Sequence, residues 1–450
     1  MSTPDDSRPT ADPAAPDAPP DRATPAGSAP DGPPGAATGG PGLWEAVRIY
    51  ARIGLLSFGG PAGQIALMQG EIVERRRWVA PDAFDRGLSF SMMLPGPEAQ
   101  QLATWLGWKL HGLRGGLAAG LLFILPGAVL MLGLAWLAAE RGQTPLVAAV
   151  FAGVQPVVIA VVLQAMRKLA GRSLGALPAY ALAVAAFLGL AVLGLPFPLI
   201  VALAAVAGLA LSLGSAGGED RTDDASAPTD WRRVGTIVGT TLAVVAMAYL
   251  AGTTALGAAL AGDIAFLFST AAFVSFGGAY ALLPYVADRA VETYGWLSAA
   301  DMLNGLAIAE ATPGPLILVT TYAGFFAGWD GPGDGVAGLA AGSLATLYTF
   351  APSFMLILVF APVVERVQNV AWARKALAGV SAAVVGVIAN LAVYLAEAAF
   401  LPTGLADPAW AKIALFAAAL YAVFVRGMGV LPLVGMGAGA GVVLHLAGLL

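Results

Sequence analysis

The sequence of 450 residues contains no cysteine and only two histidines, His111 and His445. The absence of cysteine excludes disulfide bonds, thiolate metal ligands and cysteine nucleophiles. An enzyme acting inside a membrane would need a metal cluster, or a nucleophile with its base. We therefore expect no enzymatic activity, no metal site and no cofactor, and an intramembrane enzyme is the less favoured alternative.

Charged residues are also scarce, at 11% of the chain against about 25% in soluble domains. Hydrophobic residues make up 58%, the mean hydropathy is +0.77, and no basic patch indicates a nucleic-acid partner. Apolar segments of about 20 residues, long enough to cross a bilayer as helices, occur at 117–138, 146–166, 233–252, 336–361, 376–396 and 428–449. We predict an all-α polytopic membrane protein embedded in lipid, because helices satisfy their own backbone groups there.

Two polar stretches divide the chain. Residues 1–42 consist mainly of Pro, Ala, Asp, Gly and Ser without an apolar run, a composition typical of a disordered tail. They also lack the basic start and apolar core of a secretory signal peptide. Residues 214–233 have the same polar composition. We predict a tail (1–42), a first membrane domain (43–213), a cytoplasmic linker (214–233) and a second membrane domain (234–450).

One segment of the chain occurs twice. Residues 57–97 and 275–315 align without a gap over 41 positions at an offset of 218, and they agree at 12 of them. Each segment contains Ser-Phe-Gly-Gly, then a tryptophan, then Pro-Gly-Pro. After an insertion of eight residues the match continues at an offset of 226, which pairs Pro126 with Pro352. The membrane part is therefore an internal duplication.

Basic residues lie at opposite ends of equivalent helices in the two copies. The helix expected at 146–166 is followed by basic residues from Arg167, whereas its counterpart at 376–396 is preceded by Arg374 and Lys375. Because Lys and Arg mark the cytoplasmic side, we predict two repeats of inverted topology, a common plan of secondary transporters. The N-terminus is then cytoplasmic, and we expect about 10 to 13 transmembrane helices. A duplicated structural bundle without transport is the alternative.

Two kinds of helix break recur at matched positions. Proline ends one helix and suits the first turn of the next, so a Pro-Gly-Pro break inside the membrane leaves free N–H groups and a positive dipole end, which suit an anion. Glycine in Phe-Gly-Gly allows close backbone approach to a ligand. Interrupted segments in corresponding positions indicate a transporter site, although Gly and Pro also serve packing in membrane helices. The predicted substrate-binding residues are Phe58, Gly59, Gly60, Pro95, Gly96, Pro97, Phe276, Gly277, Gly278, Pro313, Gly314 and Pro315.

Glu310 lies three residues before Pro313 in an apolar segment. A charge at membrane depth is costly and indicates function. An ionised carboxylate repels an anion, so we expect Glu310 to couple transport to a proton gradient: the protonated side chain tolerates the anion, and the deprotonated one favours its release. The alternative is a structural glutamate that is hydrogen-bonded to the broken backbone.

These motifs resemble the chromate ion transporter family. The similarity lies in "SFGGPAGQIALMQGEIVERRRW" from Ser57, "LPGPEAQQLATWLG" from Leu94, "FILPG" from Phe123 and the second "SFGG…W…EATPGPLI", and it extends over about residues 43–450. The resemblance implies two homologous domains of opposite orientation in the cytoplasmic membrane. It also implies export of chromate, a tetrahedral oxyanion similar to sulfate, with chromate resistance as the result. Many relatives have histidine where this chain has Gln64, which weakens a titrating role at that position.

The main hypothesis is thus a secondary active oxyanion exporter, and no G-x-x-x-x-G-K-[ST] motif indicates an ATP motor. Helix dipoles recognise charge and shape rather than the central atom of an anion. Sulfate or another oxyanion is therefore the alternative substrate. The sequence leaves open the coupling ion, the direction of transport and whether the protein forms a homo-oligomer.

Overall fold

The structure is a computed structural model. It describes residues 41–58, 60–142, 144–211, 213, 230–276, 279–329, 334–363, 371–402, 404 and 406–449, all within one unit, residues 39–450. Three predicted features lie wholly or mostly outside these residues: the N-terminal tail, the polar linker and three predicted site glycines, Gly59, Gly277 and Gly278.

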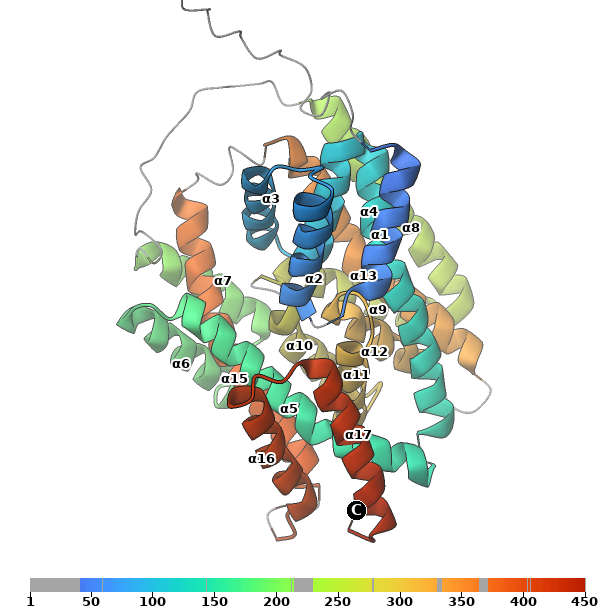
Figure 1. Ribbon diagram of the computed structural model, residues 1–450, viewed down its shortest axis with the longest axis vertical. Helices are drawn as coiled ribbons and strands as arrows, with labels where there is room; N and C mark the ends of the chain where they lie inside the picture. Colours follow the sequence, from blue (N-terminus) through green and yellow to red (C-terminus); the bar gives the residue numbers. More distant parts are fainter. Residues whose placement is uncertain are drawn as a thin grey trace, which may run out of the picture. The chain divides into compact units, whose positions relative to one another are not determined.

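Every regular element in the described ranges is a helix (Figure 1). Five of these helices are long and apolar enough to span a membrane: α4 (Glu98–Arg141), α5 (Pro145–Ser173), α8 (Trp231–Leu256), α13 (Gly335–Phe360) and α15 (Ala371–Phe400). Helix α4 consists of two helical segments, because the backbone at His111 and Gly112 is not helical. The helix that joins the two copies, α8, has only 6% of its apolar window buried inside the protein, so most of its surface suits contact with lipid. The all-α polytopic prediction is confirmed.

Two pairs of apolar helices are short. Helices α6 (Leu177–Ala191) and α7 (Phe197–Ala210) have 15 and 14 residues. At 1.5 Å per residue each is about 22 Å long, less than the roughly 30 Å hydrocarbon core. Both pack on α15, while α16 (Trp410–Phe424) and α17 (Val430–Leu446) pack on α5. Each long helix therefore carries a short hairpin from the other copy.

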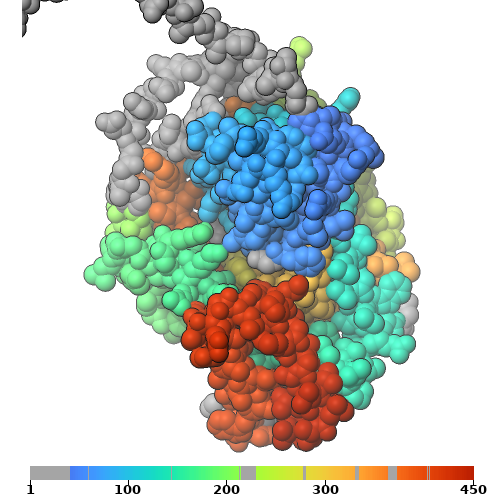
Figure 2. All heavy atoms as spheres, viewed as in Figure 1, coloured from blue at the N-terminus to red at the C-terminus, as the bar shows by residue number. Residues whose placement is uncertain are grey.

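The remaining helices occur in the same order in both copies. The first copy contains α1 (Leu43–Leu56), α2 (Gly60–Met68), the π-helix η1 (Gln69–Arg75) and α3 (Pro81–Met93). The second contains, in the same order, α9 (Ala258–Val274), α10 (Ala279–Ala287), the π-helix η2 (Asp288–Thr293) and α11 (Ala299–Ala311). The 3-10 turn η3 (Leu316–Leu318) and α12 (Val319–Ala327) then correspond to the first segment of α4. A further 3-10 turn, η4 (Ala361–Val363), follows α13. In Figure 2, α1 to α3 (blue) and α16 and α17 (red) lie at opposite ends of the visible face.

The turn before each tryptophan repeats in backbone detail. The Trp78 N–H donates to the Ile72 carbonyl at 2.9 Å, and the residues 218 positions later, Trp296 and Ala290, form the same bond at 2.8 Å. Before Trp78, Arg77 is the one non-glycine residue with positive φ in the described part of the chain, at 53°. Such a backbone costs roughly 1–2 kcal/mol for a residue with a Cβ, and the second copy has a glycine at the equivalent position, with φ 63°.

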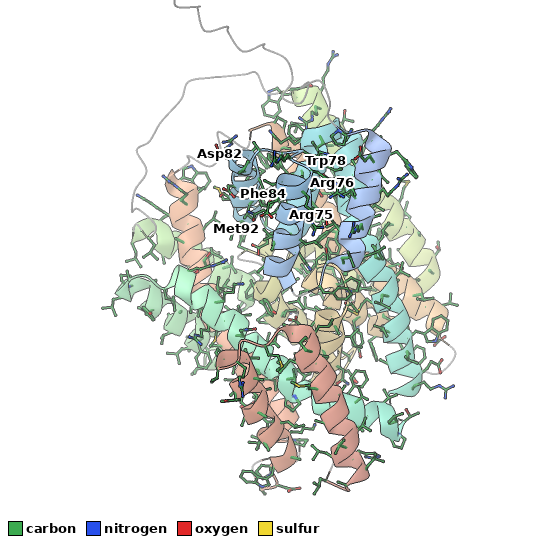
Figure 3. The ribbon with its side chains drawn as sticks, in the orientation of Figure 1. Arg75, Arg76, Trp78, Asp82, Phe84 and Met92 are labelled. Carbon is green, nitrogen blue, oxygen red and sulfur yellow. The ribbon has the colours of Figure 1, made fainter. Side chains whose placement is uncertain are left out.

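The basic cluster beside this turn is paired. Arg75 donates to the Glu71 carboxylate at 2.6 Å, and Arg76 bonds to the same group. Figure 3 shows Arg75 and Arg76 near Trp78, and the Arg76 guanidinium lies 5.5 Å from the Trp78 ring centroid. These contacts fit residues that anchor the end of a helical hairpin.

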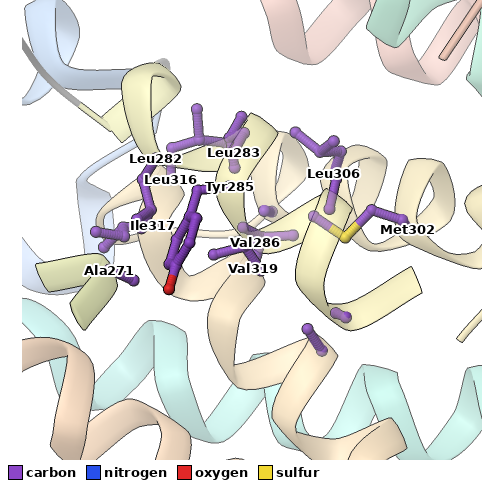
Figure 4. Close-up of a cluster of buried hydrophobic side chains, with 14 of the residues drawn as sticks. Ala271, Leu282, Leu283, Tyr285, Val286, Met302, Leu306, Leu316, Ile317 and Val319 are labelled. Atoms are coloured by element: carbon purple, nitrogen blue, oxygen red, sulfur yellow. The ribbon is translucent and has the colours of Figure 1, made fainter. Parts of the chain in front are cut away.

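The core is densely packed in the second copy. Leu282, Tyr285 and Val286 of α10 belong to one buried cluster with Leu306 of α11 and Val319 of α12 (Figure 4), and all are almost fully buried. Lipid tails are as apolar as these side chains, so van der Waals packing rather than the hydrophobic effect holds the helices together.

Small residues bring the long helices into backbone contact. A Cβ added to Gly153 of α5 would lie 2.1 Å from the Gly437 carbonyl oxygen of α17. In the other copy, a Cβ on Gly379 of α15 would lie 2.2 Å from the Ala204 carbonyl oxygen of α7. These positions require glycine, and they fix the two hairpins on the long helices.

Candidate functional site

Helices α1 and α9 both end in a tight turn at the serine of the Ser-Phe-Gly-Gly motif. Ser57 has φ −77° and ψ 65°, and Ser275 has φ −79° and ψ 77°, close to the geometry of an inverse γ-turn. The Phe58 N–H closes the first turn on the Leu56 carbonyl at 2.9 Å, and the equivalent bond of the second copy measures 3.0 Å. Each turn directs the serine carbonyl away from its own helix.

Each Pro-Gly-Pro triplet separates two helices, as the sequence predicts. Leu94 and Thr312, which precede the triplets, are extended, with ψ 147° and 151°, because a residue before proline avoids the helical region. Gly96 and Gly314 have φ of 124° and 99°, a backbone that favours glycine. Four residues therefore separate the end of one helix from the start of the next at each break.

The two kinds of break meet across the copies. The Gly96 N–H of the first copy donates to the Ser275 carbonyl of the second at 2.8 Å, and the Gly314 N–H of the second donates to the Ser57 carbonyl of the first at 2.9 Å. We call these four residues the break centre. Sequence reasoning expected free N–H groups at the breaks, but both glycine N–H groups have backbone partners.

The free donors lie one turn further on, at the start of α4. Its first intrahelical bond runs from the Gln101 N–H to the Pro97 carbonyl, and no side chain caps this end. The N–H groups of Glu98, Ala99 and Gln100 therefore precede the helical ladder, with the positive dipole end of the helix. This end of α4 therefore has the donors and the dipole that suit an anion.

Each break contacts a proline-containing helix of the other copy: α13, with Pro352, contacts the first break, and α4, with Pro126, contacts the second. A Cβ on Gly96 would lie 2.7 Å from Gln101 Nε2 and 2.8 Å from Ser353 Oγ of α13. A Cβ on Gly127 of α4 would lie 2.1 Å from the Pro313 carbonyl oxygen. Gly127 and Ser353 are equivalent residues, 226 positions apart. The space around both breaks is therefore defined by the two copies together.

Buried amides and hydroxyls surround the first copy's break. Gln101 donates to the Pro95 carbonyl at 2.7 Å, Gln100 to the Thr104 hydroxyl at 2.9 Å, and Ser353 to Gln100 Oε1 at 2.7 Å. Sequence reasoning missed this network, because two glutamines after a proline are also typical of an exposed helix start. The apolar sequence that follows Gln100 and Gln101 could have indicated that these two side chains are buried.

Gln64 links the two copies directly. Its Nε2 donates to the Gly314 carbonyl at 2.6 Å and to the Ser57 carbonyl at 3.3 Å. Three buried polar atoms near these residues lack a partner within the described residues: Gln64 Oε1, Gln101 Oε1 and Ser275 Oγ. Buried polar atoms are nearly always hydrogen-bonded, so this region suits a polar guest such as water or an oxyanion.

Glu310 is 4% exposed, and its carboxylate accepts a hydrogen bond of 2.5 Å from the Tyr280 hydroxyl. Tyr280 belongs to α10, just after the second copy's Phe-Gly-Gly motif, so the pair lies between the two breaks of that copy. No described basic side chain forms an ion pair with Glu310. The first copy has Met92 at the equivalent position, so the carboxyl belongs to one copy only.

Of the predicted site residues that the structure describes, Gly96 and Gly314 bond to the serine turns at the break centre, between the prolines of their triplets. Phe58 and Phe276 close the serine turns through their backbone N–H groups. Gly60 begins α2 with φ 70°, and nothing lies within 4 Å of a Cβ added there. No group of three or more His, Asp or Glu side chains in the described residues could hold a metal ion.

Comparison with known proteins agrees with this architecture. The chromate transporter family model matches residues 44–209 and again residues 262–443. A chromate transport protein of Pseudomonas aeruginosa is 32% identical over 364 residues, which cover 77% of this chain and 80% of the relative. A probable chromate transport protein of Synechococcus elongatus is 28% identical over 366 residues, or 80% and 87% of the two chains. No solved structure matches the chain. The chain therefore belongs to the chromate transporter family.

Proposed function

We propose that this protein exports chromate across the cytoplasmic membrane by secondary active transport, and that chromate resistance follows from the export. The observation that carries the proposal is the break centre, where helix ends and buried donors from both copies surround one region. The printed names of the relatives from P. aeruginosa and S. elongatus support chromate as the substrate.

The substrate site is proposed at the start of α4 and η3, beside the break centre. Moving a dianion out of water costs several kcal/mol, and each helix N-terminus supplies about half a positive charge. Two such ends offset about one of the two negative charges. Hydrogen bonds from groups such as the Ser275 hydroxyl, which is buried without a described partner, contribute further.

The two repeats are proposed to have inverted topology, with the N-terminus in the cytoplasm. Reciprocal bonds at the break centre and the exchange of hairpins between α5 and α15 fit two copies related by a two-fold axis. The basic residues at opposite ends of equivalent helices favour an axis in the membrane plane. Alternating access then follows from rocking of one copy against the other around the centre.

Glu310 is proposed as the proton site. A protonated Glu310 carries no charge and tolerates the dianion, so one proton and one dianion cross together with a net charge of −1. The inside-negative membrane potential drives this charge outward with about 2.3 kcal/mol per 100 mV. A carboxylate alone would repel the substrate.

Vesicles reconstituted with the full chain test the function. With an imposed membrane potential, chromate should move toward the positive side, and unlabelled sulfate should be compared with chromate as a competitor. Stronger competition by sulfate than by chromate itself would make sulfate the substrate. Absence of any transport of either anion by protein that is folded and inserted would refute the proposal.

A further inference from the structure

A single lysine lies in the apolar hairpin of α16 and α17. Lys412 is the third residue of α16, whose other residues are Ala, Leu, Ile, Phe, Tyr, Val and Trp. Its Nζ donates to Gln155 Oε1 of α5 at 2.8 Å. None of the ion pairs found in the described part of the chain includes this ammonium group.

The acceptor of this bond is itself held in place. Gln155 is 6% exposed, and its Nε2 donates to Asn304 Oδ1 of α11 at 2.9 Å. Helix α11 continues to Glu310 and the second Pro-Gly-Pro break. The cluster of Lys412, Gln155 and Asn304, named here the lysine cluster, therefore joins both copies next to a helix of the proposed transport site.

The position of the lysine does not fit a side chain that only reaches for water. A lysine near a helix end normally extends its ammonium outward to the membrane interface. Lys412 instead bonds to a residue ten positions inside α5 (Pro145–Ser173), about 15 Å along that helix from its first residue. The ammonium group therefore lies against the body of a neighbouring helix.

The charge of Lys412 is not compensated by these contacts. An ammonium group has three donors, and the described contacts use one of them, for a neutral amide oxygen. Lys412 is half-buried, and a charge withdrawn from water is costly unless an opposite charge accompanies it. The starts of α4 and η3, beside the break centre, offset only about one charge of a dianion. A mobile dianion would satisfy both needs.

We propose that Lys412 is a second binding station for the transported tetrahedral oxyanion, with Gln155 and Asn304 as the residues that position its ammonium group. The proposal rests on the proposed function, because it takes the substrate to be an oxyanion. The ammonium group of Lys412, beside α11, supplies one full positive charge in addition to the partial charges of the helix ends.

Four variants of the full-length chain in detergent micelles test the station, with equilibrium dialysis of labelled chromate and labelled sulfate. Lys412→Gln should weaken binding of the transported anion at least tenfold, whereas Lys412→Arg should stay within threefold of the wild type. Arg426→Gln removes the same charge from just beyond the other end of α16, where the side chain is exposed, and should bind normally.

Gln155→Glu is the sharpest variant, because it places a carboxylate next to Lys412 without changing the size of the side chain. A purely structural lysine would gain a salt bridge and leave anion binding intact. An anion station would be occupied by the new carboxylate, so binding should fall as in Lys412→Gln while the thermal stability is kept or raised. This variant also decides the matter if Lys412→Gln does not fold.

The outcomes separate the two proposals. Wild-type binding in both Lys412→Gln and Gln155→Glu, in a protein that transports chromate or sulfate, overturns the station and leaves the proposed function standing. A wild-type protein that neither binds nor transports either anion overturns both. Loss of binding in these two variants with normal binding in Arg426→Gln supports the station.

Discussion

Replacing Glu310 by glutamine changes one carboxylate oxygen to an NH₂ group and removes one charge and one titratable proton. The Tyr280 hydroxyl can still donate to the amide oxygen at the position of its 2.5 Å bond, so the packing of α10 and α11 should be kept. The equivalent residue of the first copy is Met92, which carries no proton. We therefore expect Glu310 to carry one proton for each transported anion.

The expected magnitude follows from that stoichiometry. One pH unit corresponds to 1.36 kcal/mol per proton, so a gradient of about two units supplies about 2.7 kcal/mol. With the membrane potential clamped at zero, the wild type should accumulate chromate about 100-fold on the alkaline side, because the anion follows the proton. Glu310→Gln should bind chromate and let it equilibrate without this accumulation.

The assay is chromate uptake into vesicles that contain the reconstituted full chain, at several imposed pH gradients. Glu397→Gln is the matched control, because that carboxylate is exposed near the end of α15 and should not alter the response. Accumulation by Glu310→Gln with the pH dependence of the wild type would refute the coupling role and leave Glu310 as a structural partner of Tyr280.

Three further predictions concern the break centre and the topology. Gln64→Leu introduces the residue found at the equivalent position 282 and leaves the buried Gly314 carbonyl without its 2.6 Å hydrogen bond. In denaturation measurements it should lower the free energy of unfolding by about 1–3 kcal/mol. An unchanged free energy of unfolding would show that the hydrogen bond does not stabilise the protein. Gly127→Val places a Cβ 2.1 Å from the Pro313 carbonyl oxygen and should abolish chromate transport, whereas Gly133→Ala on the same helix, with nothing within 4 Å, should not; normal transport by Gly127→Val would contradict the close packing. In this cysteine-free chain, single cysteines at the equivalent exposed positions 77 and 295 should react with a membrane-impermeant thiol reagent in intact cells only at 295, and labelling of both from the same side would refute the inverted repeats.

The fold could largely be predicted from composition and periodicity. All six predicted apolar segments fall in helices, in α4, α5, α8, α13, α15 and α17. The sequence analysis did not identify the short helices α6 and α7 (15 and 14 residues). Hydropathy reports only that a segment is apolar, and a short hairpin packed on α15 is as apolar as two full spans.

Only part of the site could be predicted, because some of its features depend on local sequence and others on contacts between residues far apart in the chain. The Pro-Gly-Pro breaks are local features, because proline and glycine determine the backbone wherever they occur. The partner of Gly96, by contrast, is a carbonyl 179 residues away along the chain (275 minus 96). Lys412 was missed for the same reason, since only its contact with Gln155 distinguishes it from an interfacial lysine.

The two copies match in backbone but differ in side chains, and this difference bears on the mechanism. The reciprocal hydrogen bonds at the break centre, of 2.8 and 2.9 Å, join the same kinds of groups. A second conformation in which the two copies exchange roles would therefore have hydrogen bonds of similar energy. The side chains break this equivalence: glutamines such as Gln100 occupy the first copy where the second has Leu318, and the second copy alone carries Glu310. We infer that the shared backbone permits two conformations of similar energy, while the polar side chains, through the anion and proton they bind, decide which one is populated.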